Sequence, residues 1–393
     1  MAADGEDYLR AAERTAARLP ELDGVAPLPV EAVGVVGGGT MGAGIAAAVL
    51  LAGRSLVMIE RDDAALGRGL DTVRSHLDGA LKRGKLDAGG HAAALARLSG
   101  ATDYAALGAA DLVIEAVFED MDVKRAVFAE LDRVTRAEAI LASNTSYLDV
   151  NAIATAVADP GRVVGLHFFS PAHVMKLVEV IRTDAVRPEV LATALGLARA
   201  LGKVPVPSGV CDGFIGNRIM SAYRREADYM LEDGALPQDV DAAMLAFGFP
   251  MGVFAMQDLA GLDIAWAMRQ RRAATRPASE RYVAIADKLC ELGRLGRKTE
   301  AGWYDYVEGT PTPSSVTEAI ILGESERRGI LRRAIPAEEI MARILAVMQA
   351  EGRAILAEGI AASPEAIDVV MANGYGFPKA KGGPMRMLRE ARG

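Results

Sequence analysis

The 393-residue sequence predicts an α/β protein, in which a Rossmann-type doubly wound dinucleotide-binding domain is followed by a duplicated all-helical C-terminal domain. Three observations predict this fold. Short apolar runs alternate with helical stretches up to about residue 211. A glycine-rich turn follows the first of these runs, and two helical segments of the second half resemble each other. At roughly 150 residues per domain, the length fits two or three domains.

Composition and charge exclude several classes of function. Hydrophobic residues make up 51% of the chain, which is typical of a globular protein, and the net charge of −8 argues against a nucleic-acid partner. Cys211 and Cys290 lie far apart without a metal-binding motif, so neither a disulfide framework nor a structural metal site is expected. No apolar stretch reaches the length of a membrane span, and the N-terminus lacks the apolar region of a secretory signal. We therefore expect a cytoplasmic protein with no membrane partner.

The first half of the chain has the pattern of a covered parallel sheet. Residues 1–30 are predicted as a surface helix, at 6–19, and a proline-interrupted connector. The dinucleotide-binding domain is predicted at 31–211, because its β-branched runs lack period-two alternation and each is followed by a helical stretch. These runs are 33–36, 56–59, 112–117, 140–142 and 163–166.

The second half is predicted to be almost entirely helical and duplicated. The first copy is expected at 212–309, a Pro/Ser/Thr-rich linker at 310–335 and the second copy at 336–393. Matching residues recur at offsets of 125, 127 and 128: Arg218 and Arg343, Asp241 and Asp368, Gly248 and Gly376. Asn217 of the first copy corresponds to Ala342 of the second, so the copies cannot perform the same chemistry.

The glycine turn has the sequence of a dinucleotide-binding loop. Gly37 would form the tight turn, Gly39 would let the backbone approach a pyrophosphate, and Gly42 would let helix and strand touch. Glu60 ends the next strand, where it would accept the adenosine ribose hydroxyls and repel a 2′-phosphate. NAD is therefore favoured over NADP, although Arg61 next to Glu60 could serve a phosphate instead. A glycine turn without a ligand is the alternative.

Four polar residues stand in otherwise apolar surroundings and indicate proton-transfer chemistry: Ser146, His167, Glu179 and Asn217. Oxidation of an alcohol needs a base near neutral pKa, and His is the usual choice. A Glu inside an apolar strand needs a partner, and pairing Glu179 with His167 would fix the imidazole tautomer. Each residue alone also fits a purely structural role, as a core histidine or a helix cap, and only the combination favours catalysis.

The chain resembles the 3-hydroxyacyl-CoA dehydrogenase family, most closely the dehydrogenase half of the multifunctional fatty-acid β-oxidation proteins. The resemblance extends from about Leu19 onward. It rests on the glycine loop and on further motifs that occur in order at family spacing: Glu115–Glu119 with Lys124, Ser143–Ser146, His167–Phe169, the strand holding Glu179, Asn217–Arg218 and Gly293–Thr299.

The resemblance implies reversible oxidation of an (S)-3-hydroxyacyl-CoA to the 3-oxoacyl-CoA with NAD. It assigns His167 as the base, Glu179 as the residue that orients it, and Ser146 and Asn217 to the C3 oxygen and thioester of the substrate. Together with the glycine loop, it gives the expected cofactor site: Gly37, Gly39, Met41, Gly42, Glu60, Val117, Glu119, Lys124, Ser146, Ser170 and Lys298. No metal is expected.

The sequence departs from the family pattern at three places. Ser170 stands where the family usually has an Asn that contacts the nicotinamide, and Glu60 stands where it usually has an Asp. The enoyl-CoA hydratase region of the larger relatives is absent, so hydratase activity is not expected, and a hydratase or a thiolase is a possible partner. The duplication predicts that residues 330–393 cover the apolar face of 212–307, which would give a monomer or weak dimer.

Two alternatives to a CoA-dependent dehydrogenase remain open. A related enzyme would act on a 3-hydroxyacyl thioester of acyl-carrier protein, whereas the CoA phosphates would favour a basic rim such as Arg68, Lys82, Arg83 and Lys85. A non-catalytic NAD-binding subunit would keep the fold without turnover. The intact set of Ser146, His167, Glu179 and Asn217 argues against that reading.

Overall fold

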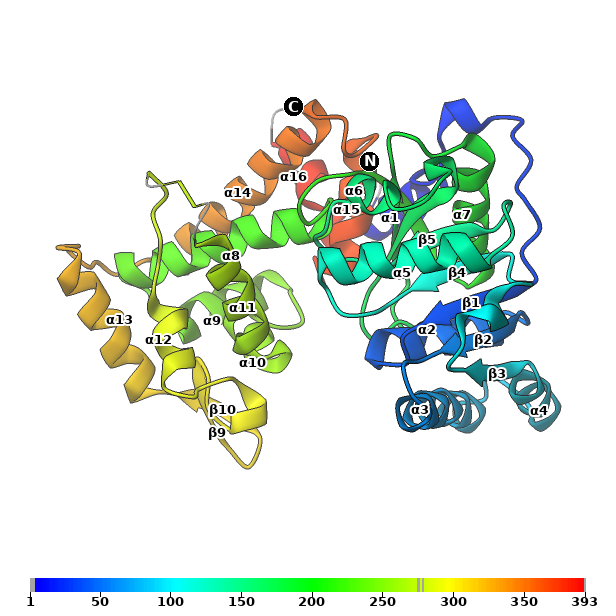
Figure 1. Cartoon of the computed structure of the whole chain (residues 1–393). Coiled ribbons are helices and arrows are strands. Elements are labelled where there is room, and N and C mark those ends of the chain that lie inside the picture. Colours follow the sequence, from blue (N-terminus) through cyan, green and yellow to red (C-terminus); the bar gives the residue numbers. More distant parts are fainter. Residues whose placement is uncertain (1–3, 274–275, 278, 392–393) are drawn as a thin grey trace. The chain divides into compact units, whose positions relative to one another are not determined.

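The computed structural model describes residues 4–273, 276–277 and 279–391 (Figure 1). The chain forms two compact units. Unit 1 comprises Met1–Arg218, Gly352–Tyr375 and Lys379–Gly393, and unit 2 comprises Ile219–Glu351 and Gly376–Pro378. The first unit therefore contains the predicted dinucleotide-binding domain and much of the second helical copy.

Unit 1 is built on an eight-stranded sheet with the order β3-β2-β1-β4-β5-β6-β7-β8. Its strands are β1 (Ala32–Val36), β2 (Ser55–Ile59), β3 (Leu98–Ala101), β4 (Leu112–Glu115), β5 (Ile140–Ser143), β6 (Val163–Phe168), β7 (Leu177–Arg182) and β8 (Val204–Gly209). The prediction of a parallel sheet is correct except at one pair, since β6 and β7 are antiparallel. The segment 169–176 between them is too short for the helical crossover that a parallel pair needs.

Helices cover both faces of the sheet, as the uninterrupted apolar runs predict. One face packs against α2 (Thr40–Leu51), α3 (Asp63–Lys82) and α7 (Pro188–Ala200), and the other against α5 (Met121–Val134) and α6 (Val150–Ala154). The short elements of this region are α4 (Ala88–Ala96), η2 (Tyr104–Leu107) and η3 (Pro160–Arg162). The doubly wound fold predicted from the sequence is therefore confirmed.

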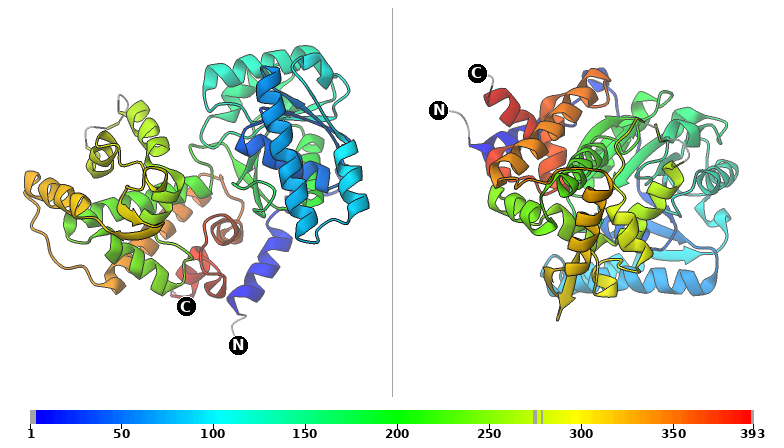
Figure 2. Two further views of the ribbon diagram at one scale, coloured as in Figure 1. Left: turned by 90° about the horizontal axis from the view of Figure 1, so that it is seen from below. Right: turned by 90° about the vertical axis from the view of Figure 1, so that its left-hand side faces the viewer.

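The N-terminal helix is part of unit 1 and is more than a surface helix. Helix α1 (Gly5–Thr15), which is followed by η1 (Pro20–Leu22), packs against α15 (Pro364–Gly374) and η5 (Lys379–Lys381). Figure 2 shows α1 (blue) beside the C-terminal helices (red), which end with α16 (Pro384–Glu390). Leu9 and Ala12 are buried, and the Tyr8 hydroxyl donates to Asp368 Oδ2 at 2.7 Å.

Unit 2 is helical, as predicted, but it also contains a β-hairpin that the sequence analysis missed. Its helices are the main part of α8 (Gly216–Asp233), α9 (Pro237–Phe247), α10 (Val253–Ala260), α11 (Leu262–Arg272), α12 (Ile285–Glu291), η4 (Arg297–Thr299), α13 (Ser315–Arg327) and the first part of α14 (Ala337–Ala357). The hairpin joins β9 (Tyr304–Val307) to β10 (Thr310–Pro313). The prolines of β10 hid this strand, because a Pro-rich run suggests a linker.

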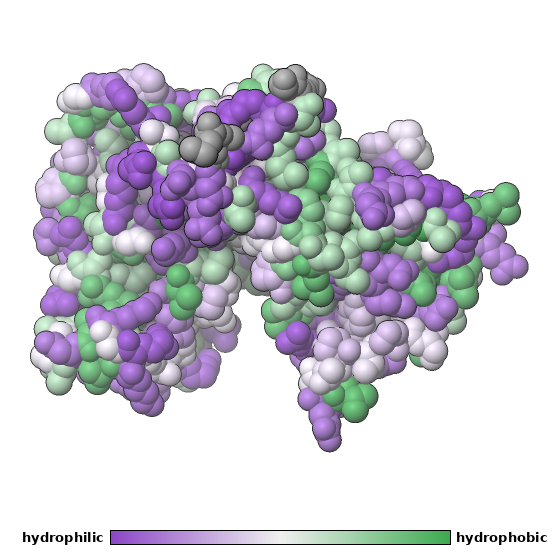
Figure 3. Space-filling view, turned by 180° about the vertical axis from the view of Figure 1, so that it is seen from behind, coloured by the Kyte–Doolittle hydropathy of each residue, from purple (hydrophilic) through white to green (hydrophobic). Residues whose placement is uncertain are grey.

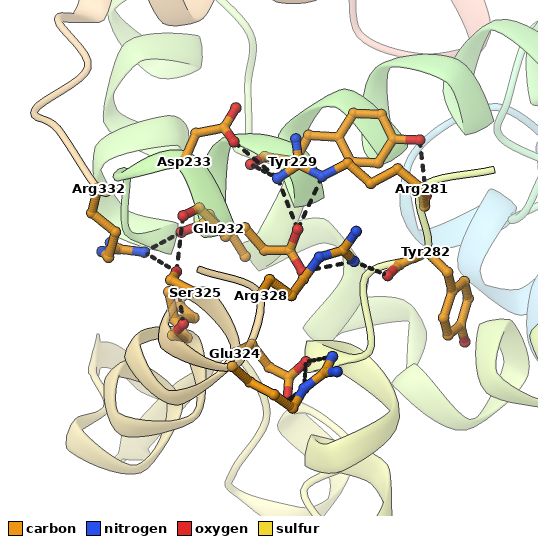
Figure 4. A network of polar contacts seen from close by, with 12 residues as sticks. Tyr229, Glu232, Asp233, Arg281, Tyr282, Glu324, Ser325, Arg328 and Arg332 are labelled. Atoms are coloured by element: carbon orange, nitrogen blue, oxygen red, sulfur yellow. Dashed lines mark hydrogen bonds and ion pairs between the residues drawn. The ribbon is translucent and has the colours of Figure 1, made fainter. Parts of the chain in front are cut away.

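The segment predicted as a linker, 310–335, is an ordered part of unit 2. It contains β10 and α13, and side chains of α13 and of the residues after it contact the end of α8 (Figure 4). The Ser325 hydroxyl donates to the Glu232 carbonyl at 2.8 Å, and Arg328 Nη1 donates to the Tyr282 carbonyl at 2.7 Å. The Glu232 carboxylate is fully buried and pairs with Arg281 at 2.8 Å and Arg328 at 3.5 Å. These contacts fix the segment on the first helical copy.

The described part of the chain has no helix that is long and apolar enough to cross a membrane. Hydrophilic and hydrophobic residues are interspersed over the face of the molecule shown in Figure 3.

Candidate functional site

The glycine loop has the geometry that a dinucleotide requires. A Cβ atom at Gly37 would lie 2.7 Å from the Ala116 carbonyl oxygen, and one at Gly42 would lie 1.8 Å from the Gly37 oxygen. Gly39, at the N-cap of α2, has no heavy atom within 4 Å of its Cβ position, so its surroundings are open. Met41 follows in the first turn of α2 and is partly buried against the core. The loop thus presents open backbone at a helix N-terminus, which suits a pyrophosphate.

Glu60 lies directly beside this loop. Its Oε1 accepts the Gly38 N–H at 2.7 Å, and its Oε2 accepts the N–H of Arg61 at 3.0 Å. The Arg61 side chain is exposed and pairs with Asp62 at 3.1 Å. The carboxylate therefore stands at the end of β2 next to the helix that would hold the pyrophosphate, as a ribose-binding acid requires.

A buried ion pair joins Glu115, at the end of β4, to Lys124 of α5. Lys124 Nζ lies 2.7 Å from Glu115 Oε1 and 3.4 Å from Glu119 Oε2, and only 1% of its side chain is exposed. The fully buried Glu115 also accepts the Ser143 hydroxyl at 2.7 Å and the Val117 N–H at 2.8 Å. Lys124 thus joins two glutamates, which satisfies its buried charge.

Glu119 in turn fixes the loop that carries Ser146. Its Oε1 accepts the Thr145 hydroxyl at 2.6 Å, the Ser146 N–H at 2.9 Å and the Tyr147 N–H at 3.1 Å. A charged acceptor shared by three donors restrains all of them. Lys124 and Glu119, both predicted as cofactor residues, therefore act together on the position of Ser146.

His167 and Glu179 are cross-strand neighbours on the antiparallel pair β6 and β7. Their side chains consequently lie on the same face of the sheet. His167 Nδ1 is 2.8 Å from Glu179 Oε2, and both side chains are buried. The Phe169 and Phe214 rings pack against the imidazole, with centroids at 4.5 and 5.6 Å. The structure therefore brings together the two residues that the sequence analysis paired.

The second oxygen of Glu179 is satisfied by the backbone at the start of α8. Oε1 accepts the N–H groups of Ile215 at 3.0 Å and Gly216 at 3.1 Å. Phe214, just before them, has a left-handed backbone with φ of 51°, which is unfavourable for an aromatic residue. This strained turn directs two N–H groups at the carboxylate, and the helix N-terminus favours its negative charge.

Asn217 follows in the first turn of α8 and reaches the Ser146 loop. Its Nδ2 donates to the Ser146 carbonyl at 3.3 Å, and its Oδ1 accepts the hydroxyl of Tyr375 at 2.8 Å. Tyr375 was missed by the sequence analysis, because it lies 158 positions away in the second copy and belongs to no motif of charged residues. Asn144 lies within the Ser143–Ser146 motif, and its Oδ1 accepts the Phe168 N–H at 2.9 Å, which joins the ends of β5 and β6.

Two predicted cofactor residues lie outside this cluster of contacts. Ser170 is exposed just after β6. Lys298 belongs to unit 2, where its Nζ pairs with Asp263 Oδ1 at 2.6 Å. Among the described residues, no group of His, Cys, Asp and Glu side chains could hold a metal ion.

Known proteins resemble this chain in both sequence and structure. Residues 32–211 match the NAD binding domain of 3-hydroxyacyl-CoA dehydrogenase, and residues 213–306 match the C-terminal domain of the same family. The peroxisomal bifunctional enzyme of Cavia porcellus is 42% identical over 96% of the chain. The alignment spans 54% of that enzyme, so the chain spans about half the length of the curated relatives it matches.

Two solved structures support the same assignment. The 3-hydroxybutyryl-CoA dehydrogenase of Escherichia coli is 31% identical, with a TM-score of 0.80 over 93% of this chain and 92% of that one. The dehydrogenase part of multifunctional enzyme 1 from C. elegans is 27% identical, with a TM-score of 0.67 over 95% of this chain and 86% of that one. By its two matched domains and its structural relatives, the chain belongs to the 3-hydroxyacyl-CoA dehydrogenase family of NAD-binding oxidoreductases.

Proposed function

We propose that the chain interconverts (S)-3-hydroxyacyl-CoA and 3-oxoacyl-CoA with NAD, and that His167 is the general base and Glu179 the residue that orients it. The observation that carries the proposal is the 2.8 Å contact between these buried side chains. Both lie in the sheet whose strand β1 leads into the glycine loop, and the sheet falls within residues 32–211, which match the NAD binding domain of the family.

The hydrogen bonds of Glu179 determine which nitrogen of His167 can act as a base. Two backbone N–H groups donate to Oε1, so this carboxylate serves as an acceptor, and Oε2 can accept in turn from His167 Nδ1. A neutral imidazole with its proton on Nδ1 carries its lone pair on Nε2. Nε2 therefore takes the hydroxyl proton of the substrate during oxidation and returns it during reduction, while Glu179 stabilises the imidazolium.

The remaining residues bind and orient the reactants. The glycine loop and Glu60 would hold the pyrophosphate and ribose of NAD, and the open surroundings of Gly39 fit that group. When bound, NAD supplies the acceptor for the hydride that leaves C3 of the substrate. Ser146 and Asn217 would hold the C3 oxygen and the thioester, and Glu119 restrains Ser146 through its backbone N–H.

The decisive measurement follows NADH absorbance with acetoacetyl-CoA and with longer 3-oxoacyl-CoAs. His167→Ala should lower kcat by about 10²–10⁴ while NADH binding persists. His91→Ala is the matched control, because His91 also contacts a carboxylate at 2.8 Å, that of Asp78, but lies on α4. Its kcat should equal that of the wild type. Unchanged turnover in His167→Ala would refute the role of the base.

The substrate and cofactor classes are tested in the same assay. Rates with one acyl group on CoA and on acyl-carrier protein separate the two thioesters, and NADPH in place of NADH tests the role of Glu60. We expect CoA and NADH to support the faster reaction. Absence of turnover with every thioester would favour a non-catalytic NAD-binding subunit. We further propose that the protein is cytoplasmic and is a monomer or weak dimer. A monomer mass in solution that does not change with concentration would support the monomer, and an obligate dimer through residues 212–307 would contradict it.

A further inference from the structure

We propose that Tyr375 is a positioning residue for the reaction, and that its hydroxyl holds the side-chain amide of Asn217 in the orientation that offers N–H to the substrate. The inference rests on the proposed function, which places Asn217 at the substrate. Tyr375, Asn217 and its other partner, Ser146, all belong to unit 1. Tyr375 comes from the second helical copy, directly after α15, whereas Asn217 belongs to the first copy.

The hydrogen-bond partners of Asn217 determine which way its amide faces. The Ser146 carbonyl can only accept, so the group that faces it at 3.3 Å must be Nδ2. The Oδ1 atom then faces Tyr375, and a carbonyl oxygen requires a donor, which the Tyr375 hydroxyl provides at 2.8 Å. Nδ2 carries two N–H bonds, of which the Ser146 carbonyl accepts one. The other is the donor that the proposed function assigns to the substrate.

The Tyr375 ring is held in place by its packing. A Cβ atom at Gly216 would lie 2.1 Å from Cε2 of Tyr375, so the ring packs directly against the Gly216 backbone, and any side chain at position 216 would clash with it. The same Gly216 donates its N–H to Glu179. The ring also meets Phe169 edge to face, with centroids 5.5 Å apart, and Phe169 packs on His167. Tyr375 therefore binds Asn217 directly and packs against Phe169, the ring that contacts His167.

The two helical copies differ at this position in a complementary way. The aligned segments Gly248–Pro250 and Gly376–Pro378 place Tyr375 opposite Phe247 in the alignment. Phe247 has no hydroxyl, and its ring packs against Phe249 and Phe377. At the other position, the first copy has Asn217 and the second has Ala342. The amide is thus present only in the first copy, and the hydroxyl that binds it only in the second.

Without the hydroxyl, the amide would lose the shorter of the two hydrogen bonds that fix its orientation, and only the 3.3 Å bond to the Ser146 carbonyl would remain. Oδ1 would lack this donor, and rotation of the amide by 180° would turn the oxygen toward the Ser146 carbonyl and the substrate. An oxygen at that place repels the thioester oxygen instead of stabilising it. The chemical step should therefore be slower and substrate binding weaker, whereas the glycine loop and Glu60 should bind NADH as before.

Tyr375→Phe tests the proposal, because it keeps the ring contacts and removes only the hydroxyl. We expect kcat with acetoacetyl-CoA to fall about fivefold, as for the loss of one ordinary hydrogen bond, and KM for NADH to stay within about twofold of the wild type. Tyr8→Phe is the matched control, since the Tyr8 hydroxyl makes a similar bond, at 2.7 Å to Asp368, in the same unit. It should lower the melting temperature and leave kcat unchanged.

A double-mutant cycle with Asn217→Ala distinguishes positioning from packing. If Tyr375 acts through the amide, Tyr375→Phe should change kcat by less than about twofold in the Asn217→Ala background. A fivefold loss in both backgrounds, or wild-type kcat in the single variant, would overturn the inference and leave the proposed function intact. A wild type that turns over no thioester would instead overturn the proposed function, and the inference with it.

Discussion

The two helical copies bury the same aspartate in the same way but complete the site with tyrosines from different places. Asp241 accepts the N–H groups of Phe254 and Ala255 at 2.9 Å, at the start of the next helix. Asp368 accepts those of Met385 and Arg386 at 2.8 and 3.0 Å. In both copies a glycine makes room, because a Cβ atom at Gly252 or Gly383 would lie about 2 Å from the aspartate.

The third donor to each aspartate is a tyrosine hydroxyl. Tyr304, in the β-hairpin, donates to Asp241 at 2.8 Å, and Tyr8, in the N-terminal helix, donates to Asp368 at 2.7 Å. Tyr304 lies near the C-terminal end of the first copy, whereas Tyr8 precedes the dinucleotide-binding domain. Each copy thus has a buried aspartate with two backbone donors from the next helix. The third donor, a tyrosine hydroxyl, comes from a different segment in each copy.

Contacts between the copies are reciprocal. Arg218 binds Glu358 with two bonds, at 2.6 and 2.8 Å, and the corresponding residues, Arg343 and Asp233, meet at 3.0 Å. Gly248 packs against Pro378, and Gly376 packs against Pro250. Position i of the first copy contacts position j of the second, and position j of the first copy contacts position i of the second, as in a two-fold interface. The duplication inferred from the sequence therefore has a structural counterpart.

Removing either buried aspartate should produce the largest loss of stability. Asp241→Ala and Asp368→Ala each leave two backbone N–H groups and a hydroxyl without their acceptor, which should cost about 4 kcal/mol of the free energy of unfolding. Urea unfolding measures both. Asp71→Ala, at an exposed residue that pairs with Arg74 at the surface, should cost less than about 0.5 kcal/mol. A large loss in only one copy would show that the two sites are not equivalent.

The copies also differ at Asp228, which corresponds to the exposed Arg353. Burial raises the pKa of Asp228 to about 7, and its Oδ1 has no hydrogen-bond partner among the described residues. An acid whose folded pKa exceeds its unfolded pKa takes up a proton on folding, so stability falls as pH rises until the folded pKa is passed. Between pH 5 and pH 8, the free energy of unfolding of the wild type should fall by about 3 kcal/mol relative to that of Asp228→Asn. If the free energies of unfolding of the wild type and Asp228→Asn differ by the same amount at every pH, the raised pKa of Asp228 is contradicted.

The copies should be unequal in catalysis. Asn217→Ala should lower kcat about 10²-fold, which is about 2.7 kcal/mol, because it removes a donor at the site of charge development. Introducing the same residue into the second copy, by Ala342→Asn, should neither change kcat in the wild type nor restore it in Asn217→Ala. Steady-state rates with acetoacetyl-CoA test both statements. Restoration by Ala342→Asn would mean that the second copy can form a site of its own.

The smallest effects should come from the two tyrosines. Tyr8→Phe and Tyr304→Phe each remove one hydrogen bond to a buried aspartate and should cost about 1 kcal/mol. Hydrogen exchange locates the change, which for Tyr8→Phe we expect in α1 and α16 and for Tyr304→Phe in the β-hairpin and α10. Equal loss of protection throughout the chain in either variant would contradict a local role.

Much of the fold could be predicted because it depends on local patterns. The glycine loop is recognisable from neighbouring residues, and a Glu in an apolar strand signals a buried partner. The antiparallel turn between β6 and β7 was missed, because apolar runs do not report strand direction. Tyr375 was missed for a different reason: its role depends on a contact between residues 158 positions apart. Strand β10 and helix α13 were missed because prolines and serines masked them as a linker.

The reciprocal contacts within one polypeptide have a consequence for how this site could evolve. In an assembly of two identical subunits every codon change appears twice, so a polar group that helps at one place must be tolerated at its mirror place. Here each half mutates separately, and a hydroxyl at Tyr375 imposes nothing on Phe247, which stays among phenylalanines. Because both copies belong to one chain, the first can carry the amide of Asn217 and the second the hydroxyl of Tyr375 that binds it.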